Sequence, residues 1–505
     1  MTAVVLALGV YFSILALLVL IGVHRLYLAL VARRGPPRLD PPPPETWPTL
    51  VVQVPVYNEA FVAVRAIEAV AALSYPRDRL EIQVLDDSTD DTRLEIARTV
   101  AALSARGVPI RVLHRAERTG YKAGALAHGM NETSAERVAI FDADFVPPPD
   151  FLLKAMAILE SDPGLGLVQG RWAHLNADRS TLTRAQGLFL DAHFSVEHAA
   201  RSRQGHPFNF NGTAGVWRRA AIEAAGGWSA DTLTEDLDLS YRALLAGWRF
   251  VYADALEAPA ELPETWLGFR AQQARWVRGG VQTARKLLGR VWRAPAWTLG
   301  QKLEATMHLT GNIAYLLMAL LAILLPVAVY LRHLAAPTGL VGALVDLGSM
   351  GIGVGALVYF YATAAALRSR PLPLRDLGLA LCVGVGLCLS NAVEVLAALV
   401  RPAGEFVRTP KRGEAERGEM VARYRSPSAR GRAVLEGGAA LLHLVTIGYA
   451  LVIGSYAVIP FLAIHAIGFG IVSIGTWREE TERAEPARND KMTERRNDDI
   501  AKFRL

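Results

Sequence analysis

Cysteine is scarce in this chain, and its placement excludes two common uses of the residue. The 505 residues include only Cys382 and Cys388, and both lie inside one apolar run. Two cysteines in such a setting form neither a disulfide framework nor a metal-binding motif. They fit a reducing compartment or simple packing among apolar neighbours.

Glycine-rich phosphate-binding turns are also missing from the sequence. No G-x-G-x-x-G turn follows the first expected strand, and no G-x-x-x-x-G-K-[ST] stretch occurs. These two patterns place backbone nitrogens around phosphates in dinucleotide-binding and P-loop proteins. Neither class of nucleotide site is therefore expected here.

Acidic residues are in slight deficit. The chain has 54 Lys and Arg against 48 Asp and Glu, which gives a net charge of +6 and an isoelectric point near 9.3. The basic residues concentrate beside apolar runs, where anionic lipid headgroups attract them. We therefore expect no nucleic-acid partner.

The apolar residues are abundant but unevenly distributed. Hydrophobic residues make up 52% of the chain, yet 20% of it is charged. Residues 1–32 and most of 305–476 form apolar runs long enough to cross a bilayer, which needs about 20 residues per helix, whereas residues 49 to about 300 carry scattered charge. This division predicts an integral membrane protein with one large extramembrane domain.

The first apolar run, from Val4 to Leu30, predicts the orientation. It lacks the basic start of a secretory signal and is longer than one, and basic residues follow it instead. By the positive-inside rule the N-terminus lies outside and the large domain is cytosolic. The expected location is a multi-pass, bacterial-type inner membrane.

Changes of composition divide the chain into eight expected segments. They are an N-terminal transmembrane helix at 1–34, a proline-rich linker at 35–48, a cytosolic domain at 49–262, amphipathic interface helices at 263–300, transmembrane or re-entrant helices at 301–400, a cytosolic loop at 401–432, a transmembrane hairpin at 433–477 and a charged tail at 478–505. Tryptophan among arginines in the interface segment predicts a helix pair in the headgroup plane. The tail is expected to be disordered or weakly helical.

One apolar segment, 376–400, creates a conflict of topology. The loops that flank it, 368–375 and 401–432, are rich in arginine and should both be cytosolic. Asn391 and Glu394 also make a crossing costly. We predict that the segment is re-entrant or ends as an interface helix, and a simple six-span topology is the alternative.

Strand and helix patterns alternate between residues 50 and 141. Expected strands cover 50–55, 80–85, 110–113 and 137–141, and expected helices cover 59–73, 92–105 and 122–129. Strands separated by helices predict a Rossmann-like α/β domain with a mostly parallel sheet.

Carboxylates follow two of these strands. Asp142 and Asp144 come directly after the fourth strand, at the sheet edge where open α/β proteins bind ligands. Such a pair can hold a divalent metal against a pyrophosphate, although the pattern is also common by chance. Asp86 and Asp87 end the second strand and are suited to bind a base or ribose.

Basic and acidic groups elsewhere suit the chemistry of sugar transfer. Arg118 and Lys122 are placed to meet phosphates, or they are ordinary surface charges. Asp236 is a candidate base for an acceptor hydroxyl, although Thr234-Glu235-Asp236 is equally an ordinary start for the helical run 237–245. Trp276 can stack on a sugar ring.

In order and spacing, these patterns resemble the D, DxD, TED and Q(Q/R)xRW set of processive family-2 glycosyltransferases, which include cellulose, chitin and hyaluronan synthases. The segments that carry the resemblance are Asp86-Asp87, Asp142-x-Asp144, Thr234-Glu235-Asp236 and Gln272-Gln273-x-Arg275-Trp276. The strings at 168–172, 210–218 and 261–263 narrow it to the cellulose-synthase-like branch with plant mannan, glucomannan and xyloglucan-backbone synthases. The similarity is close over 49–300 and loose in the apolar part.

The resemblance implies a GT-A fold and a role for each matching residue. It implies a catalytic set of Thr234, Glu235 and Asp236, a donor-nucleotide set of Asp86, Asp87, Arg118, Lys122, Asp142, Gln272, Gln273 and Arg275, an acceptor set of Asn211, Gly212, Thr213 and Trp276, and Mg²⁺ or Mn²⁺ on Asp144 and Asp142. The stretch 406–411 is similar to the FxVTxK gating loop, which places Phe406, Thr409 and Lys411 at the donor nucleotide. Arg408 stands where the usual motif has valine.

The implied activity is an inverting, processive synthase that makes a β-linked hexose polysaccharide of the β-glucan or mannan type and passes it through the membrane. UDP-glucose is the preferred donor and GDP-mannose the alternative; the growing polysaccharide and membrane lipid are the other partners, and an accessory translocation subunit is compatible with this activity. His308 and Asn312 are expected either on the polysaccharide path or as interface anchors. The alternatives are a glycosyltransferase that adds one sugar to a lipid, and a transporter or scaffold with a degenerate nucleotide domain.

Overall fold

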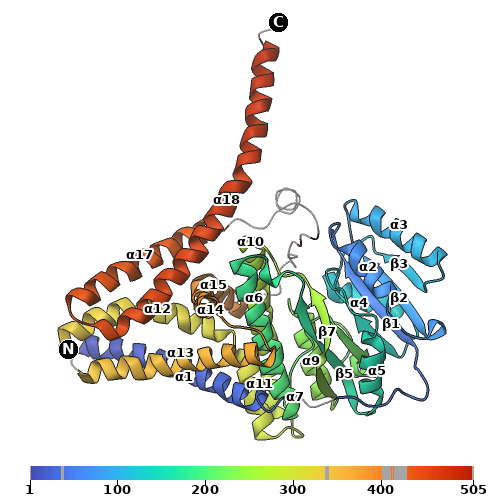
Figure 1. Cartoon of the computed structure of the whole chain (residues 1–505), viewed down its shortest axis with the longest axis horizontal. Coiled ribbons are helices and arrows are strands. Elements are labelled where there is room, and N and C mark those ends of the chain that lie inside the picture. Colours follow the sequence, from blue (N-terminus) through green and yellow to red (C-terminus); the bar gives the residue numbers. More distant parts are fainter. Residues whose placement is uncertain are drawn as a thin grey trace.

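The computed structural model describes residues 2–35, 39–335, 340–400, 411, 413 and 429–502. A sheet domain lies beside a bundle of long helices, and the last helix extends away from both (Figure 1). The chain therefore has the expected combination of an α/β domain and a helical region.

Seven strands of the described residues form one sheet. They are β1 Leu50–Val56, β2 Leu80–Asp86, β3 Ile110–His114, β4 Arg137–Ile140, β5 Leu165–His174, β6 Gly215–Arg218 and β7 Arg249–Ala260. Their order is β3-β2-β1-β4-β6-β5-β7. Only β6 runs antiparallel to its neighbours, β4 and β5, so the prediction of a mostly parallel sheet is confirmed.

Helices cover the sheet and connect its strands. In the sheet domain they are α2 Ala63–Ala71, α3 Thr92–Ala105, α4 Tyr121–Asn131, α5 Phe151–Glu160, α6 Thr181–Ala192, α7 Ala199–Arg203, α8 Arg219–Ala224 and α9 Glu235–Leu245, with a π-helical turn, η3 His193–His198, between α6 and α7 and short 3₁₀ turns at Arg77–Arg79 and Ala177–Arg179. α2 begins four residues later than predicted. Asn58 has a φ of 53°, and its side chain accepts a hydrogen bond from the Thr89 nitrogen, so the chain turns before the helix starts.

The central strands are apolar on both faces because both faces are covered. Leu50, Val52 and Val54 of β1 pack into one core cluster, while Val51 packs with Val138 into another on the opposite side. Successive strand residues point to opposite faces, so a strand that is buried on both sides has a nearly continuous apolar sequence. This is why β1 and β4 could be recognised from the sequence.

The remaining helices form the bundle at the left of Figure 1 and its connection to the sheet domain. They are α1 Thr2–Ala32, α10 Trp266–Arg293, α11 Leu299–Thr310, α12 Ile313–Ala335, α13 Leu340–Leu367, α14 Leu374–Gly386, α15 Cys388–Val400, α17 Arg430–Val452, the 3₁₀ turn Tyr456–Val458 and α18 Ile459–Lys502. Among the described residues, five helices are long and apolar enough to cross a membrane, or six if α14 and α15 count as one span.

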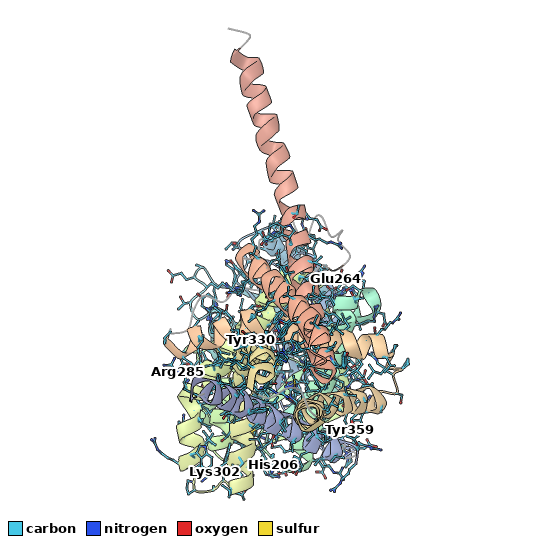
Figure 2. All side chains as sticks on the ribbon, turned by 90° about the vertical axis from the view of Figure 1, so that its left-hand side faces the viewer. His206, Glu264, Arg285, Lys302, Tyr330 and Tyr359 are labelled. Atoms are coloured by element: carbon cyan, nitrogen blue, oxygen red, sulfur yellow. The ribbon has the colours of Figure 1, made fainter. Side chains whose placement is uncertain are left out.

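The predicted interface segment differs from its expected form. It is one helix of 28 residues, α10, followed by the shorter α11, rather than a pair within 264–297. Arg270 of α10 makes two hydrogen bonds of 2.8 and 3.0 Å to Glu436, and Arg285 donates to the Ala398 carbonyl. Figure 2 shows all side chains on the ribbon and labels Arg285. These arginines therefore meet protein partners from the bundle, which the amphipathic pattern alone cannot distinguish from headgroups.

The C-terminal tail also differs from its expected form. The backbone continues as a helix to Lys502, so most of 478–505 is helical rather than disordered or weakly helical. Alanine, glutamate, lysine and arginine are strong helix formers, and the low apolar content that suggests disorder does not oppose a helix that continues from a packed one.

The contested segment 376–400 consists of α14 and α15, which are bent by 41° at the break between them. Glu394 lies in α15 and is buried, but Arg278 contacts one of its oxygens and Arg432 lies 2.7 Å from the other. The charge is therefore neutralised inside the protein. The cost of a charge in lipid, which argued against a crossing, does not apply to Glu394 as it stands here.

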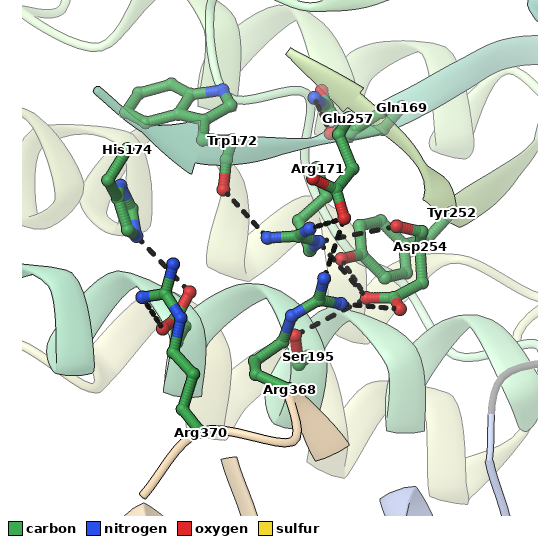
Figure 3. A network of polar contacts seen from close by, with 12 residues as sticks. Gln169, Arg171, Trp172, His174, Ser195, Tyr252, Asp254, Glu257, Arg368 and Arg370 are labelled. Atoms are coloured by element: carbon green, nitrogen blue, oxygen red, sulfur yellow. Dashed lines mark hydrogen bonds and ion pairs between the residues drawn. The ribbon is translucent and has the colours of Figure 1, made fainter. Parts of the chain in front are cut away.

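The connection before α14 contacts the sheet domain (Figure 3). Arg368 lies 3.0 Å from Asp254 and 2.7 Å from Glu257, both on β7, and Arg370 lies 3.2 Å from Asp191 at the end of α6. The chain therefore enters α14 beside the sheet domain. Beyond α15, Lys411 contacts that domain as well.

Candidate functional site

A cleft opens at the carboxyl ends of the central strands. The residues that the sequence singles out and that line it are Asp87, Arg118, Lys122, Asp142, Asp144, Asn211, Gly212, Thr234, Glu235, Asp236, Gln272, Arg275, Trp276 and Lys411. The sheet edge, the start of α9, the helix α10 and one residue of the 401–432 segment thus surround one cavity. Phe406, Thr409 and Arg408 lie outside the described residues.

The two carboxylates after β2 have different surroundings. Asp87 lines the cleft, and Arg115 holds it with a two-pronged contact of 2.8 and 2.6 Å. Asp86 is fully buried and does not line the cleft; it accepts a hydrogen bond from the Ser88 nitrogen and faces His114 at 3.2 Å. Adjacent strand residues point to opposite sides, so only one of the two acids can face a ligand.

An aromatic and cationic surface adjoins Asp87. The guanidinium of Arg118 lies 3.6 Å from the centre of the Tyr57 ring and 5.0 Å from that of Tyr121. Tyr57 lines the cleft with Arg118. Burial lowers the pKa of Arg118 below its usual value, but guanidinium pKa values are high enough that the group stays charged.

Lys122 joins three of the expected motifs at the centre of the cleft. Its ammonium lies 2.5 Å from Asp142, donates to the Gly212 carbonyl at 2.9 Å, and lies 4.0 Å from Glu235. Burial opposes the charge, but the attraction of Asp142 and Glu235 is stronger and raises the pKa of Lys122. The lysine is therefore a fixed positive charge in the site.

Lys411 lies against the second acid of the Asp-x-Asp pair. Its ammonium is 2.8 Å from Asp144 and also donates to the Glu261 carbonyl. The Glu261 side chain accepts from the Gly413 nitrogen at 3.1 Å and contacts Arg65 at 2.7 Å. Lys411 and Gly413 are thus held at the cleft by Asp144 and Glu261.

The acidic side chains of the cleft fit a divalent metal ion only when a bound ligand supplies further coordinating atoms. Among the described residues no group of three or more His, Cys, Asp or Glu side chains is arranged to bind a metal. Asp144 does hold a cation, the Lys411 ammonium, which shows that the position accepts positive charge. Mg²⁺ and similar ions at nucleotide sites use one or two carboxylates and complete their shell with phosphates and water. Asp144 fits that kind of site.

The Thr234-Glu235-Asp236 segment starts α9 inside the cleft. Thr234 is at the cap position but makes no side-chain cap; its hydroxyl lies 3.2 Å from that of Thr283. Asp236 accepts a hydrogen bond from the Leu237 nitrogen at 2.8 Å. Burial and the adjacent Glu235 carboxylate raise the pKa of Asp236 to about 7, against the opposing effect of Lys122. A carboxylate with this pKa can accept a proton near neutral pH.

The Asn211-Gly212-Thr213 segment forms the floor beside Asp236. Asn211 and Gly212 line the cleft, whereas Thr213 is fully buried and its hydroxyl accepts from the Asp142 nitrogen at 2.9 Å. The Ser240 hydroxyl of α9 accepts from the Phe210 nitrogen at 2.9 Å and so ties this segment to the helix that carries Asp236.

The helix α10 closes the cleft on the side of the bundle. Gln272, Arg275 and Trp276 line the cavity, whereas Gln273 does not. The Trp276 and Trp172 rings lie 6.4 Å apart with a tilt of 54°, which makes an aromatic wall of two residues. Burial lowers the pKa of Arg275, and neighbouring acids, Glu235 first among them, oppose this.

His308 and Asn312 do not line the cleft. His308 is packed against α9, where its ring nitrogen lies 2.8 Å from the Tyr241 hydroxyl. Asn312 lies beside Gly280 of α10. Both residues contact α9 or α10 from behind.

Several residues of the site were not identified from the sequence. Arg115 lies 28 positions from Asp87, and Glu261 belongs to a family string that assigns it no contact. The Gln169 side chain accepts a hydrogen bond from the Asn211 nitrogen at 3.0 Å. His174 lines the cleft, and its ring lies 3.2 Å from Asp191. The one available signal is that Gln169 and Glu261 lie in strings shared with the cellulose-synthase-like branch.

Comparison with known families agrees with these motifs. The model of the "Glycosyltransferase like family 2" matches residues 48–279. The chain is 43% identical over 310 residues to glucomannan 4-beta-mannosyltransferase 1 of Oryza sativa subsp. japonica, covering 57% of this chain and 60% of the relative. It is 45% identical over 251 residues to glucomannan 4-beta-mannosyltransferase 2 of Arabidopsis thaliana, covering 49% and 47%. The chain thus spans about half the length of the curated relatives it matches.

A solved structure has a similar fold. The mannosyltransferase PcManGT from Pyrobaculum calidifontis, in complex with GDP-Man and Mn²⁺, superposes with a TM-score of 0.52 at 23% identity. The alignment covers 71% of this chain and 97% of that one. At this identity the likeness concerns the fold, which is that of GT-A enzymes.

Proposed function

Residues 48–279 match the model of the "Glycosyltransferase like family 2", and from this premise we propose that the chain is a hexosyltransferase that extends a β-linked mannan or glucomannan. The observation that carries the proposal is the convergence of Asp87, Asp144, Asp236 and Trp276 on one cleft. These residues supply contacts for a nucleotide, a diphosphate, an acceptor hydroxyl and a sugar face. The curated relatives are named as 4-beta-mannosyltransferases, which favours a β-1,4 linkage here.

GDP-mannose is the donor we propose. The sequence analysis preferred UDP-glucose as the donor. The curated relatives are named as mannosyltransferases, which favours GDP-mannose instead. Asp87 and the Tyr57–Arg118 pair form the end of the cleft that suits a nucleobase. The diphosphate then lies toward Lys122 and Asp144, the centre of positive charge and the carboxylate that would hold a metal.

The residues present support a direct displacement. The acceptor hydroxyl gives its proton to Asp236 as its oxygen bonds to C1 of the donor sugar, and the bond between C1 and the diphosphate oxygen breaks with inversion. Lys122 stays protonated and stabilises the departing negative charge. Asp144 would hold Mg²⁺ or Mn²⁺, which when bound supplies further positive charge for the leaving diphosphate. Trp276 and Trp172 hold the acceptor sugar by its apolar face.

The topology we propose has five spans and one segment that returns. Arg368 before α14 and Lys411 after α15 both contact the sheet domain, which supports a re-entrant course for 376–400. The N-terminus is then outside, the glycosyltransferase domain is cytosolic, and the C-terminal end of α18 lies on the cytosolic side. This arrangement keeps both arginine-rich loops inside. A bacterial-type inner membrane, translocation of the product and an accessory subunit stay predictions.

A donor and product screen tests the function. The purified full-length protein is incubated with radiolabelled GDP-mannose, GDP-glucose, UDP-glucose or UDP-GlcNAc, with Mg²⁺ or Mn²⁺, and products are separated by size and by solubility in organic solvent. We expect incorporation from GDP-mannose into a polymer that an endo-β-1,4-mannanase degrades. Incorporation from UDP-glucose alone would overturn the donor assignment, and a single-sugar lipid would establish the alternative function.

A further inference from the structure

Two motifs of the cleft approach each other unusually closely at Gly279, three residues after Trp276 on α10. A Cβ atom built at residue 279 would lie 2.5 Å from Cγ2, 2.7 Å from Oγ1 and 2.8 Å from the backbone nitrogen of Thr234. Real Cβ contacts are essentially never shorter than 3.0 Å. The helix and the start of the Thr234-Glu235-Asp236 segment can therefore touch only because residue 279 has no side chain.

Two further contacts hold the same segment on α10. The Thr234 hydroxyl lies 3.2 Å from that of Thr283, one turn beyond Gly279 on the same face of the helix. The Leu233 nitrogen donates to the Gln282 side chain at 3.1 Å. Thr283 is fully buried and Gln282 nearly so. Residues 279, 282 and 283 thus form a seat for residues 233–234.

We propose that Gly279 is a positioning residue that sets the distance between the acceptor platform on α10 and the base on α9. The inference rests on the proposed function, in which Trp276 holds the acceptor sugar and Asp236 removes its proton. Both residues must be placed relative to one acceptor hydroxyl. The seat at Gly279 brings the backbone of α10 close to the side chain and the backbone nitrogen of Thr234, two residues before Asp236.

The displacement that a methyl group would impose is large enough to affect transfer. Moving the Thr234 nitrogen from 2.8 Å to an ordinary contact of 3.4 Å requires about 0.6 Å. Thr234 is β-branched and stiff about χ1, so its side chain cannot rotate freely out of the way. Misplacement of a catalytic group by about 1 Å can reduce a rate about 100-fold.

The same helix provides two matched controls. Gly289 has no atom within 4 Å of a built Cβ, and at Gly280 the two atoms within 4 Å are Nδ2 and Cγ of Asn312, at 2.3 and 3.6 Å, in the outer part of a flexible side chain. Gly279→Ala, Gly280→Ala and Gly289→Ala therefore make the same change in helix propensity. They differ in whether the new methyl group meets backbone, a movable side chain or open space.

The three variants are compared in the full-length protein by kcat, KM, binding of GDP, the pH–rate profile and hydrogen exchange of peptides covering 232–241. We expect Gly279→Ala to lower kcat about 100-fold, to leave the Kd of GDP within about twofold, and to speed exchange at 232–241. Gly280→Ala and Gly289→Ala should stay within about twofold of the parent in each measurement. The acid limb of the pH–rate profile should move only in Gly279→Ala, because Asp236 changes its surroundings there.

The proposal is overturned if Gly279→Ala matches Gly289→Ala in kcat and in exchange at 232–241. If the parent protein transfers no sugar, the proposed function fails, while the exchange data still decide whether the seat exists. If Gly279→Ala does not fold, Thr283→Val replaces it, since this variant keeps the shape and removes one hydroxyl. It should lower kcat about fivefold with unchanged GDP binding, the equivalent of one hydrogen bond; an unchanged kcat would then sink the idea.

Discussion

Acidic side chains have different partners in the helical bundle and in the cleft. Glu436 and Glu394, where α10 meets the bundle, are paired with arginines: Arg270 for the first, Arg278 and Arg432 for the second. In the cleft, Asp142 and Asp144 are paired with lysines, Lys122 and Lys411. The two kinds of partner are not equivalent, because arginine binds a carboxylate with a rigid fork and lysine binds it as a single point charge.

The arginine pairs stabilise the arrangement of the helices, whereas the lysine pairs lie where we propose that the reaction takes place. An arginine fork holds helices in one arrangement, as Arg270 does between α10 and α17. A lysine can be exchanged for another cation or turned toward an incoming phosphate. Asp87 lines the cleft, but its partner is an arginine, as in the bundle: Arg115 binds both of its carboxylate oxygens. In the proposed binding mode, the end of the cleft that would hold the nucleobase is therefore rigid, and the end that would hold the diphosphate is able to exchange its partners.

Removing the base should have the largest effect of any single change in the cleft. Asp236→Asn keeps the shape and the hydrogen bond from the Leu237 nitrogen but cannot accept a proton. We expect kcat to fall about 1,000-fold, within the range for general base catalysis, with GDP binding unchanged. Measured turnover near that of the parent protein would remove Asp236 from the mechanism.

Breaking an arginine pair should affect stability rather than chemistry. Glu436 is fully buried and holds Arg270 in a two-pronged contact, so Glu436→Gln leaves a buried charge without its partner. We expect a loss of about 3 kcal/mol of folding stability, measured by thermal unfolding in detergent. Glu95→Gln breaks the exposed pair with Arg98 and should cost less than about 1 kcal/mol. Equal effects in the two variants would contradict the structural role of the arginine pairs.

Neutralising the second acid of the Asp-x-Asp pair should alter the response to metal. Asp144→Asn removes one negative charge from the position that Lys411 now faces. We expect the Mn²⁺ concentration for half-maximal activity to rise about tenfold or more, because carboxylates are the protein ligands that such ions prefer. A titration that superposes on that of the parent protein would place the metal elsewhere.

The pH dependence should follow the ionisation of Asp236. Its pKa is raised to about 7 by burial and by Glu235, so the carboxyl is increasingly protonated, and inactive as a base, below that pH. We expect kcat/KM at pH 6 to be about one tenth of its plateau value above pH 8. A rate that is flat between pH 5.5 and 8, measured under saturating metal, would contradict this assignment.

Much of the fold could be predicted from the sequence for strands that are buried on both faces. The apolar runs of β1 to β4 and the period of α3 identified their elements to within one or two residues. Strands β5 to β7 were not predicted, because the second half of β5 carries polar side chains that have specific partners. Gln169 donates to the Thr213 and Ala214 carbonyls, and Arg171 pairs with Glu257, which also pairs with Arg368 of the α13–α14 connection (Figure 3). A strand whose polar residues serve contacts does not show the alternation or the apolar run of a core strand.

The candidate site was predictable in its motifs but not in its pairings. The motifs stand at strand ends and at the start of α9, where position along the chain reveals them. The lysine and arginine partners are distant in sequence, such as Lys411 for Asp144, so no local pattern points to them. Strand alternation could have predicted which of Asp86 and Asp87 faces the cleft. Asp86 accepts a hydrogen bond from the Ser88 nitrogen in the turn after β2, so its side chain faces away from the cleft.

The most direct test is a structure of the full-length protein with GDP, Mn²⁺ and a short manno-oligosaccharide. The account predicts that Asp144 contacts the metal in place of Lys411, that Lys122 faces the diphosphate, and that Asp236 lies about 3 Å from the acceptor hydroxyl above Trp276. A complex in which the nucleotide or the oligosaccharide occupies another part of the molecule, with the Asp144–Lys411 pair intact, would contradict it.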